Sequence, residues 1–591
     1  MIEGGNVRLT KLTTFLRPYR AAAILGPLFM ILEVCMDLLQ PRFMAGIVND
    51  GVTAGHLSAV WQYGGWMIGA ACVGLIGGVG CTYFSTLASQ GFGTDLRNRL
   101  FRRVQTFTFR NLDALTTGSL VTRLTADIVQ LQNLVMMSLR MLVRDFFLFA
   151  GSLTMAFLIN PRLALLCLAI LPVLFAILYV TLRRSAPLFR QVQEKLDRVN
   201  TVVQENLSGI RVVKAFVRAG FERARFGRAN RDNRDMAIRA ARAVAVNVPL
   251  LTLILNAGVV AVLWFGGNLT KTGGLEVGSL AAFITYVSQM AFAMAALGNL
   301  VVTISRAKAS AARIREVLDT VPDMAEPPAR ETDSVEDETI RAERIVFDGV
   351  SFAYGAEGDD LVLRGVNLAV EPGQTVGILG ATGSGKSTLV SLIPRMYDAA
   401  AGRIAIGGVD VKDIPSARLR RQVGMVLQQA VLYSGTIRDN IRYGKPDATQ
   451  EEVEAAARAA EAHGFIAGFP DGYDTKVGQK GVNLSGGQKQ RISIARAILL
   501  NPGILILDDS TSAVDLGTES RIQSALRERM KSSTRLIIAQ RISSVIDADK
   551  IVVLDEGRIA AEGTHDELLA RSPVYREIYQ SQRGKEALYH V

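Results

Sequence analysis

The sequence of 591 residues predicts an α-helical membrane-spanning bundle, with six spans and long helical extensions, followed by an α/β domain of the phosphate-loop type. Two observations support this division. Long apolar stretches recur through the first half of the chain, and from about residue 344 short apolar runs alternate with helical patterns. One of these short runs leads directly into a glycine-rich loop, as expected where a strand precedes a helix.

Six stretches approach or exceed the roughly 20 largely apolar residues that a membrane-spanning helix requires. They lie at about 21–47, 59–88, 132–159, 161–182, 244–267 and 277–304. Lys11, Arg17 and Arg20 precede the first span, whereas the loop 48–58 contains neither Lys nor Arg. Because basic residues are retained on the cytoplasmic side, the N-terminus is predicted to be cytoplasmic. An even number of spans places the C-terminal half in the cytoplasm as well.

The positive charge of the chain belongs to its first half. Residues 1–320 carry 34 Lys and Arg against 17 Asp and Glu, which leaves 32 against 38 for residues 321–591. A basic protein can be a nucleic-acid binder, but here the basic residues flank apolar spans, where membrane topology explains them. We therefore predict a lipid bilayer, and no nucleic acid, as the surroundings of this half.

Polar regions separate some of the spans and predict helices that continue beyond the membrane. Residues 89–131 and 183–243 contain few prolines or glycines, and each pair of extensions is expected to meet at a tip, near Asn111–Gly118 and near Asn206–Gly209. Residues 321–343 combine prolines with an acidic run and are interpreted as a linker. The expected division is a transmembrane domain at 1–320, a linker at 321–343 and the α/β domain at 344–591.

The glycine-rich loop fits the pattern G-x-x-x-x-G-K-[ST] in full. It follows the apolar run 375–379 and opens a helical run. Its glycines allow backbone N–H groups to surround phosphate oxygens, with the lysine reaching the terminal phosphates and the serine available to Mg²⁺. The predicted phosphate-binding residues are Gly380, Ala381, Thr382, Gly383, Ser384, Gly385, Lys386, Ser387 and Thr388.

A second motif is an apolar strand that ends in a carboxylate, Asp508. At the end of a buried parallel strand this group can hold Mg²⁺ beside the phosphate loop. Between the two motifs stands the pentapeptide Leu-Ser-Gly-Gly-Gln at 484–488. With these elements in this order, the sequence resembles the ATP-binding cassette (ABC) family.

The resemblance covers nearly the whole chain and implies further roles. Tyr354 stands where the family stacks an aromatic ring on adenine, and Gln428 stands at the loop that senses Mg²⁺ and the membrane domain. Residues 109–131 and 203–216 look like the two intracellular coupling loops of ABC exporters. The implied cofactors are ATP and Mg²⁺, with Ser387, Gln428 and Asp508 around the metal.

The family also implies a dimer. In it the signature residues, here Ser485, Gly486, Gly487 and Gln488, complete the ATP site of the opposite subunit. Two ATP molecules are then held between two cassettes, and their closure and reopening drive the membrane domains between inward-facing and outward-facing states. A second half-transporter is therefore an expected partner, together with a small-molecule substrate.

Two positions depart from the family pattern at the catalytic site. Asp509 stands where active members carry the glutamate that polarises the attacking water, and Gln540 stands where they carry a histidine that contacts the γ-phosphate. Aspartate is one methylene shorter, which withdraws the carboxylate by about 1–1.5 Å, a displacement that matters for positioned chemistry. The two departures indicate a site that binds ATP and hydrolyses it slowly, as in the degenerate subunit of heterodimeric multidrug exporters.

Two acidic residues lie four apart on the first span, Glu33 and Asp37, and so share one helix face. Acids within a membrane usually face a bundle interior or cavity. They are candidates for a contact to a cationic substrate, and the alternative is a structural pairing. Arg144, in the third span, is expected to be paired or to extend toward the interface.

Three functions remain compatible with these patterns. The first is export of an apolar or amphipathic substrate by a heterodimer whose partner carries the intact glutamate and histidine. The second is a slow homodimeric transporter, and the third is an ATP-gated regulator or channel. By resemblance, the expected location is a bacterial cytoplasmic membrane.

Overall fold

The computed structural model describes residues 9–327, 343–355 and 360–589. They form two compact units. The helical unit comprises Met1–Gln105 and Thr117–Thr320, and the α/β unit comprises Thr106–Thr116 and Val321–Val591. Each unit is described by itself.

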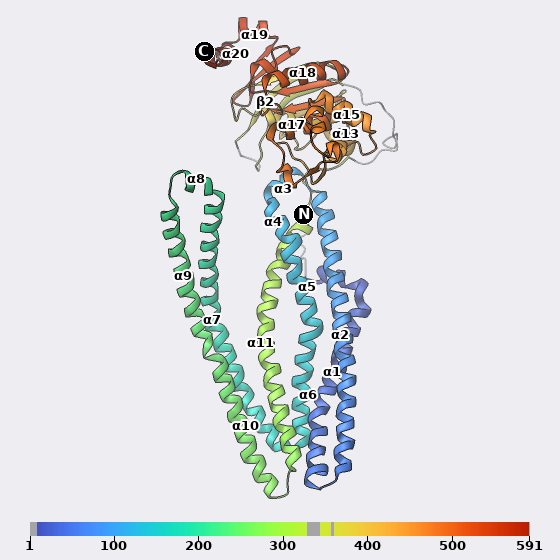
Figure 1. Cartoon of the computed structure of the whole chain (residues 1–591), viewed down its shortest axis with the longest axis vertical. Coiled ribbons are helices and arrows are strands. Elements are labelled where there is room, and N and C mark those ends of the chain that lie inside the picture. Colours follow the sequence, from blue (N-terminus) through green and yellow to red (C-terminus); the bar gives the residue numbers. More distant parts are fainter. Residues whose placement is uncertain (1–8, 328–342, 356–359, 590–591) are drawn as a thin grey trace. The chain divides into compact units, whose positions relative to one another are not determined.

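Long helices build the helical unit (Figure 1). The pair α7 and α9 run side by side and are joined at one end by the short α8, which is the second of the two tips expected from the sequence. The helices of this unit are α1 (Arg20–Gly46), α2 (Leu57–Gln105), α4 (Thr117–Thr122), α5 (Ile128–Met137), α6 (Val143–Ile159), α7 (Pro161–Ser208), α8 (Ile210–Ala215), α9 (Ala219–Ala245), α10 (Asn247–Lys271) and α11 (Val277–Asp319).

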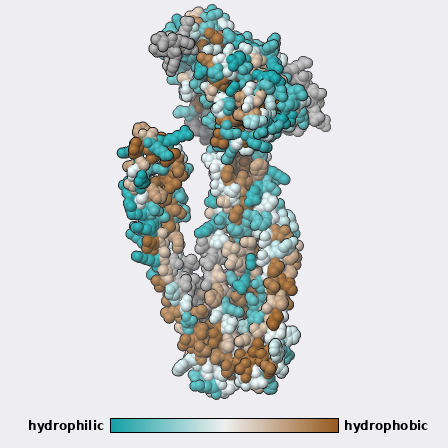
Figure 2. All heavy atoms as spheres, viewed as in Figure 1, coloured by the Kyte–Doolittle hydropathy of each residue, from teal (hydrophilic) through white to brown (hydrophobic). Residues whose placement is uncertain are grey.

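Five segments of this unit are long and apolar enough to cross a membrane among the described residues. They are Thr14–Thr53, Leu57–Gln105, Thr117–Ile159, Thr252–Lys271 and Val277–Met294. The sixth expected span, 161–182, forms the first part of α7, where the side chains of several residues lie outside the described ones. Figure 2 shows hydrophobic side chains on the surface of this unit, gathered near the turns between its helices.

A buried carboxylate connects two parts of the helical unit, at a place outside the middle of the apolar segments. Asp127, only 2% exposed, accepts hydrogen bonds from the hydroxyl of Ser310 at 2.8 Å and from the guanidinium of Arg313 on α11. A buried charge is tolerated only when it is paired and hydrogen-bonded. The contact therefore fixes α11 against the π-helical segment Arg123–Asp127, which lies between α4 and α5.

Two main sheets form the α/β unit, in the orders β2-β1-β4-β5 and β12-β11-β3-β10-β9-β6. Strands β11, β3, β10, β9 and β6 pair in parallel, and β12 is antiparallel. The strands are β1 (Ile345–Phe352), β2 (Leu363–Val370), β3 (Thr375–Leu379), β4 (Ala401–Ile406), β5 (Val409–Asp410), β6 (Val423–Val426), β7 (Gly435–Thr436), β8 (Lys476–Val477), β9 (Ile504–Asp508), β10 (Thr534–Ile538), β11 (Lys550–Asp555) and β12 (Arg558–Gly563).

Helices cover these sheets and bury two apolar cores. Strands β3, β9 and β10 are buried along their whole length, as expected for parallel strands covered on both faces. The helices of this unit are α3 (Phe109–Leu115), α12 (Lys386–Ser391), α13 (Ser416–Gln422), α14 (Ile437–Ile441), α15 (Gln450–Ala459), α16 (His463–Ala467), α17 (Gly486–Leu500), α18 (Leu516–Arg529), α19 (His565–Arg571) and α20 (Pro573–Tyr589).

The expected division assigned all of residues 1–320 to the transmembrane domain. In the structure Thr106–Thr116, which contains α3, packs with the α/β unit. The ring of Phe109 lies 5.9 Å from that of Tyr397, and the Tyr397 hydroxyl donates to Asp113 at 2.9 Å. Thr108 caps α3 and also hydrogen-bonds to Asp323. The tip expected near Asn111–Gly118 is thus a short helix docked on the cassette.

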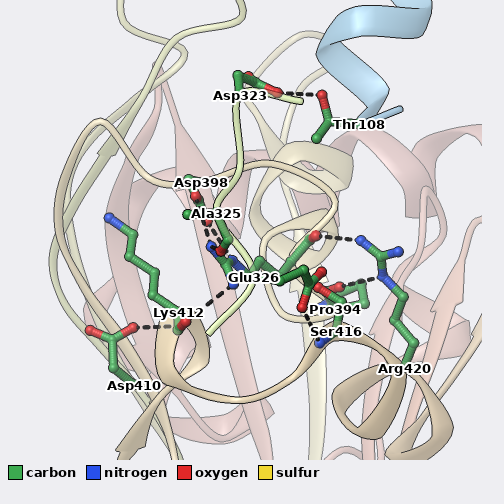
Figure 3. Close-up of polar contacts among 11 residues, drawn as sticks. Thr108, Asp323, Ala325, Glu326, Pro394, Asp398, Asp410, Lys412, Ser416 and Arg420 are labelled. Atoms are coloured by element: carbon green, nitrogen blue, oxygen red, sulfur yellow. Dashed lines mark hydrogen bonds and ion pairs between the residues drawn. The ribbon is translucent and has the colours of Figure 1, made fainter. Parts of the chain in front are cut away.

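The first residues of the linker are docked on the same unit. Figure 3 shows Ala325 and Glu326 beside Asp398, Lys412 and Ser416. At the centre, the guanidinium of Arg395, 3% exposed, donates to Asp398, to the Lys412 carbonyl and to the Ala325 carbonyl. The remainder of the predicted linker, 328–342, lies outside the described residues.

Candidate functional site

The carboxyl ends of four neighbouring parallel strands converge on one place. Loops leaving β3, β10, β9 and β6 lie at the same edge of the sheet, which is where open α/β sheets bind ligands. A cavity of about 580 Å³ opens there. Its lining includes all but Ser384 of the predicted phosphate loop, together with Tyr354, Gln428, Asp508, Asp509 and Gln540.

The phosphate loop adopts a backbone that demands glycine at particular places. Gly380, Gly383 and Gly385 have φ of +149°, +87° and +99°, values that L side chains rarely adopt. A Cβ on Gly380 would lie 2.1 Å from the carbonyl oxygen of Leu554, so no side chain fits there. The loop therefore depends on glycine at these positions to keep its backbone conformation.

Two polar side chains of the loop, those of Lys386 and Ser384, differ in their position, because only Lys386 lines the cavity. Lys386 Nζ donates to the carbonyl oxygens of Gly380 and Ala381, at 2.8 and 2.7 Å, and so crosses its own loop. Burial lowers the pKa of this ammonium, although Asp508 and Asp509 act in the opposite direction. The buried Oγ of Ser384 has no hydrogen-bond partner among the described residues. A buried hydroxyl without a partner carries a free-energy cost, and Ser384 does not line the cavity in which a phosphate would lie.

Of the three residues predicted around the metal, Ser387 and Asp508 are in contact, whereas Gln428 donates to Asp509. The Ser387 hydroxyl donates to Oδ1 of Asp508 at 3.0 Å, which joins the start of α12 to the end of β9. Burial raises the pKa of Asp508, while the hydrogen bond from Ser387 lowers it. The described residues contain no group of three or more His, Cys, Asp or Glu that could hold a metal. A hydroxyl and one carboxylate suit Mg²⁺, which takes few protein ligands and completes its shell with water and phosphate oxygens.

The two positions that depart from the family pattern lie in contact. Gln540 Nε2 donates to Oδ2 of Asp509 at 2.7 Å, and Gln428 Nε2 donates to the same oxygen at 3.1 Å. Asp509 has a positive φ of +47°, and its N–H donates to the Ile538 carbonyl across the sheet edge. Burial raises the pKa of this carboxyl, and the two amides oppose that effect. The side chain of Asp509 is only 8% exposed, and two neutral donors fix its position.

Tyr354 closes one side of the cavity. Its hydroxyl lies 2.9 Å from the hydroxyl of Thr388, and its ring packs edge-on against Phe352 and Tyr397. The side chain is 47% exposed, which leaves part of the ring available to a flat ligand. Aromatic rings of this kind stack on nucleobases.

The signature residues are not among those that line this cavity. Ser485 instead caps α17, because its hydroxyl accepts from the N–H of Gln488 at 3.3 Å and Gln488 reciprocates at the Ser485 N–H. Ser485 and Gly486 are exposed. The cavity and the signature are therefore two separate features of one chain.

Two residues that contact the loops of this site, but do not line the cavity, carried no sequence signal. Glu519, on α18, is 5% exposed and accepts hydrogen bonds from the hydroxyls of Thr511 and Ser544. Gln582 on α20 bonds to the backbone beside Gln540. Neither residue belongs to a motif, and only the folded chain brings them to the site.

The intramembrane acids differ in their contacts. Asp37 forms an ion pair with Arg144 at 3.5 Å, so the expected pairing of Arg144 is confirmed. Glu33 forms no ion pair within the described part of the helical unit, and its carboxylate lies against Gly78 on α2. The two acids therefore share a helix face and have different surroundings.

Comparisons with known proteins agree with this architecture. The family model of the ABC transporter transmembrane region matches residues 23–294, and that of the ABC transporter matches residues 363–512. The ABC transporter ATP-binding protein YfiB of Bacillus subtilis is 41% identical over 578 residues, which are 98% of this chain and 99% of that protein. An ATP-dependent lipid A-core flippase of Syntrophus aciditrophicus is 36% identical over 507 residues, 85% and 83% of the two chains.

A solved structure shows the same fold. The structure of a bacterial Atm1-family ABC exporter with ATP bound superposes with a TM-score of 0.76, at 28% identity, over 96% of this chain and 98% of that one. The relatives match along nearly the whole chain, and the cavity contains the elements of an ATP site. The chain therefore belongs to the ABC transporter family, as an ATP-dependent exporter with a transmembrane region and an ABC ATPase domain fused in one polypeptide.

Proposed function

We propose that this chain is the slow-site half of a heterodimeric exporter. One observation carries the proposal: the short carboxylate of Asp509 is engaged by two neutral amides, from Gln428 and Gln540. Both amides donate to Oδ2, which leaves Oδ1 as the oxygen that could take a proton, and a base must lie within hydrogen-bond reach of the attacking water. Aspartate is withdrawn from that position, and glutamine supplies no proton that it could exchange. The site keeps what binding requires and lacks what fast hydrolysis requires.

The signature residues of this chain are the part that would complete the ATP site of a partner, and we propose that this partner has an intact catalytic centre. Ser485 and Gly486 are exposed on the surface and capped as a helix start, ready to contact a second cassette. In the partner's site these residues would face a glutamate and a histidine supplied by the partner. Hydrolysis in the heterodimer would then occur mainly at the site that this chain completes.

The membrane region supports an apolar or amphipathic substrate, of drug or lipid type. Of the two acids of α1, Glu33 has no ion pair in the described residues, whereas Asp37 is paired with Arg144, whose charge also acts on Glu33. Glu33 is therefore the residue proposed to contact a cationic group of the substrate. We place the six spans in a bacterial cytoplasmic membrane, with the cassette in the cytoplasm.

The deciding experiment is to purify the chain alone and to measure ATP binding, ATP hydrolysis and subunit mass together. ATP binding with negligible hydrolysis is the expected result. Addition of a chain that carries glutamate and histidine at the corresponding positions should then restore turnover. Robust hydrolysis by a homodimer would show that Asp509 and Gln540 suffice, and it would support the slow homodimeric transporter instead. Ion leak without turnover would support the ATP-gated channel.

A further inference from the structure

A side chain near the C-terminus holds the loop that carries Gln540. Gln582 on α20 donates through Nε2 to the carbonyl oxygen of Gln540 at 2.8 Å, and its Oε1 accepts from the N–H of Ile542 at 2.9 Å. One amide therefore satisfies a backbone acceptor and a backbone donor that lie two residues apart. This pair of contacts fixes the direction of the loop as well as its distance from α20.

The loop leaves β10 after Ile538, and the Ala539 N–H still donates to the Ile378 carbonyl at 3.3 Å. Buried Ile542 then opens a short 3-10 helix, so Gln540 lies between two stretches that the unit already supports. The side chain of Gln540 projects from the loop to Oδ2 of Asp509, at 2.7 Å. A small shift of the Gln540 backbone would carry its amide away from that oxygen, since hydrogen bonds weaken steeply with distance and angle.

A second contact holds the far end of the same loop. Buried Glu519 accepts from the Ser544 hydroxyl at 2.6 Å and pairs with Arg541 at 3.6 Å. It also accepts from Thr511, which follows Asp509 in the chain. Glu519 thus holds the loop from within the unit, and Gln582 holds it from α20.

Helix α20 is itself anchored firmly enough to act as a support. Tyr575 is fully buried, and its hydroxyl lies 2.6 Å from Nδ1 of His565 on α19. Gln582 follows Tyr575 by seven residues, which is two helical turns, so both side chains lie on the same face of α20. The buried face of the helix therefore determines where the Gln582 amide stands.

We propose that Gln582 is a positioning residue for the nucleotide site: it holds the backbone of Gln540 and Ile542 so that the Gln540 amide stays on Asp509 and faces the terminal phosphate. The inference rests on the proposed function in one respect, the assignment of Gln540 to the γ-phosphate. Gln582 is not among the residues that line the cavity, so it acts through Gln540 and not on the nucleotide itself.

The first arm of the test needs no turnover. Hydrogen exchange is measured on the full-length protein in lipid nanodiscs, comparing Gln582→Ala with Gln580→Ala, an exposed glutamine on the same helix. Loss of two neutral hydrogen bonds should speed exchange across residues 539–545 by about fivefold or more. The Gln580 control should exchange as the parent does. Parent-like exchange in the Gln582→Ala protein would overturn the inference.

The second arm tests the action through Gln540. The ratio of ATP to ADP affinity is measured for Gln582→Ala, Gln540→Ala and the double variant. We expect each single change to lower the ratio by about fivefold, with ADP affinity unchanged, and the double variant to match Gln540→Ala, because residues acting through one contact are not additive. Additive losses, or a parent-like ratio in Gln582→Ala, would overturn the inference.

A third variant separates positioning from simple packing. Gln582→Glu keeps the acceptor for the Ile542 N–H and loses the donor for the Gln540 carbonyl. It should restore protection at Ile542 while the nucleotide ratio stays low. A parent-like ratio in Gln540→Ala would contradict the assigned role of Gln540, which belongs to the proposed function, whereas the exchange result bears on Gln582 alone.

Discussion

Gln540 donates its side-chain amide to Oδ2 of Asp509 at 2.7 Å, so the two residues that depart from the ABC pattern form one contact. The contact spans 31 positions of the chain and joins the carboxyl ends of the neighbouring parallel strands β9 and β10. Because one residue accepts what the other donates, the two substitutions are structurally matched. A glutamate–histidine pair would place a longer acid opposite a titratable ring at the same location.

Restoring that pair should increase ATP turnover. The variant Asp509→Glu with Gln540→His returns both a carboxylate of full length and a group that exchanges protons near pH 7. We expect turnover by the purified protein to rise about 10²-fold, the lower end of the range for a positioned acid or base. Phosphate release at saturating ATP is the measurement, with each single change as a control. Unchanged turnover in the double variant would disprove the slow-site explanation.

The structure brings together those predicted site residues that belong to motifs. The phosphate loop, Tyr354, Gln428 and Asp508 lie around one cavity, because the ends of parallel strands bring such motifs to one edge. The positions of α3, Glu519 and Gln582 could not be predicted. Each depends on packing between distant parts of the chain, such as the rings of Phe109 and Tyr397, and no local pattern encodes such a contact.

The Ser387–Asp508 pair should determine the response to Mg²⁺. Ser387→Ala removes one oxygen, and Asp508→Asn removes the negative charge beside it. We expect each change to weaken the Mg²⁺-dependent part of ATP binding about tenfold, with little further loss in the double variant, because both groups act on one ion. The measurement is ATP affinity across a Mg²⁺ titration.

Ser391→Ala is the matched control for this prediction. Ser391 lies on the same helix, α12, and its hydroxyl donates to the backbone carbonyl of Thr388 instead of reaching the cavity. Its variant should keep the Mg²⁺ dependence of the parent. If Ser391→Ala and Ser387→Ala lost the same affinity, the effect would come from damage to α12 and not from the metal.

Arg395 should be important for the stability of the α/β unit. Its guanidinium is 3% exposed and holds Asp398 together with the Ala325 and Lys412 carbonyls. Burial opposes ionisation of the nearby Glu326, but its hydrogen bonds from Ser416 and the charge of Arg395 hold the pKa of that carboxyl below its usual range. Arg395→Ala leaves buried acceptors without a donor, at a cost of about 2–4 kcal/mol.

Thermal unfolding of the purified protein, monitored with Arg403→Ala beside it, measures this cost. Arg403 pairs with Asp410 near the surface, where an ion pair contributes about 0–1 kcal/mol. The Arg395 variant should therefore melt several degrees below the Arg403 variant. Equal melting temperatures would show that the linker contacts do not stabilise the unit.

ATP affinity should fall as the pH rises into the alkaline range, because of Lys386. Burial lowers the pKa of its ammonium, so the charge is lost at a lower pH than for an exposed lysine. The protonated form attracts phosphate, and the neutral form does not. Affinity should therefore be constant near pH 7 and decrease toward pH 10. Equilibrium ATP binding in a series of buffers measures the effect, at constant ionic strength because exposed charges are screened by salt.

Lys386→Arg separates this titration from other alkaline effects. A guanidinium stays charged across the whole range, although its planar shape suits the loop less well. The variant should bind ATP more weakly at pH 7 and then show a flat profile where the parent declines. Parallel declines in the two proteins would mean that another group titrates, and that the charge of Lys386 does not set the alkaline limit. A flat variant beside a declining parent assigns that limit to the buried ammonium.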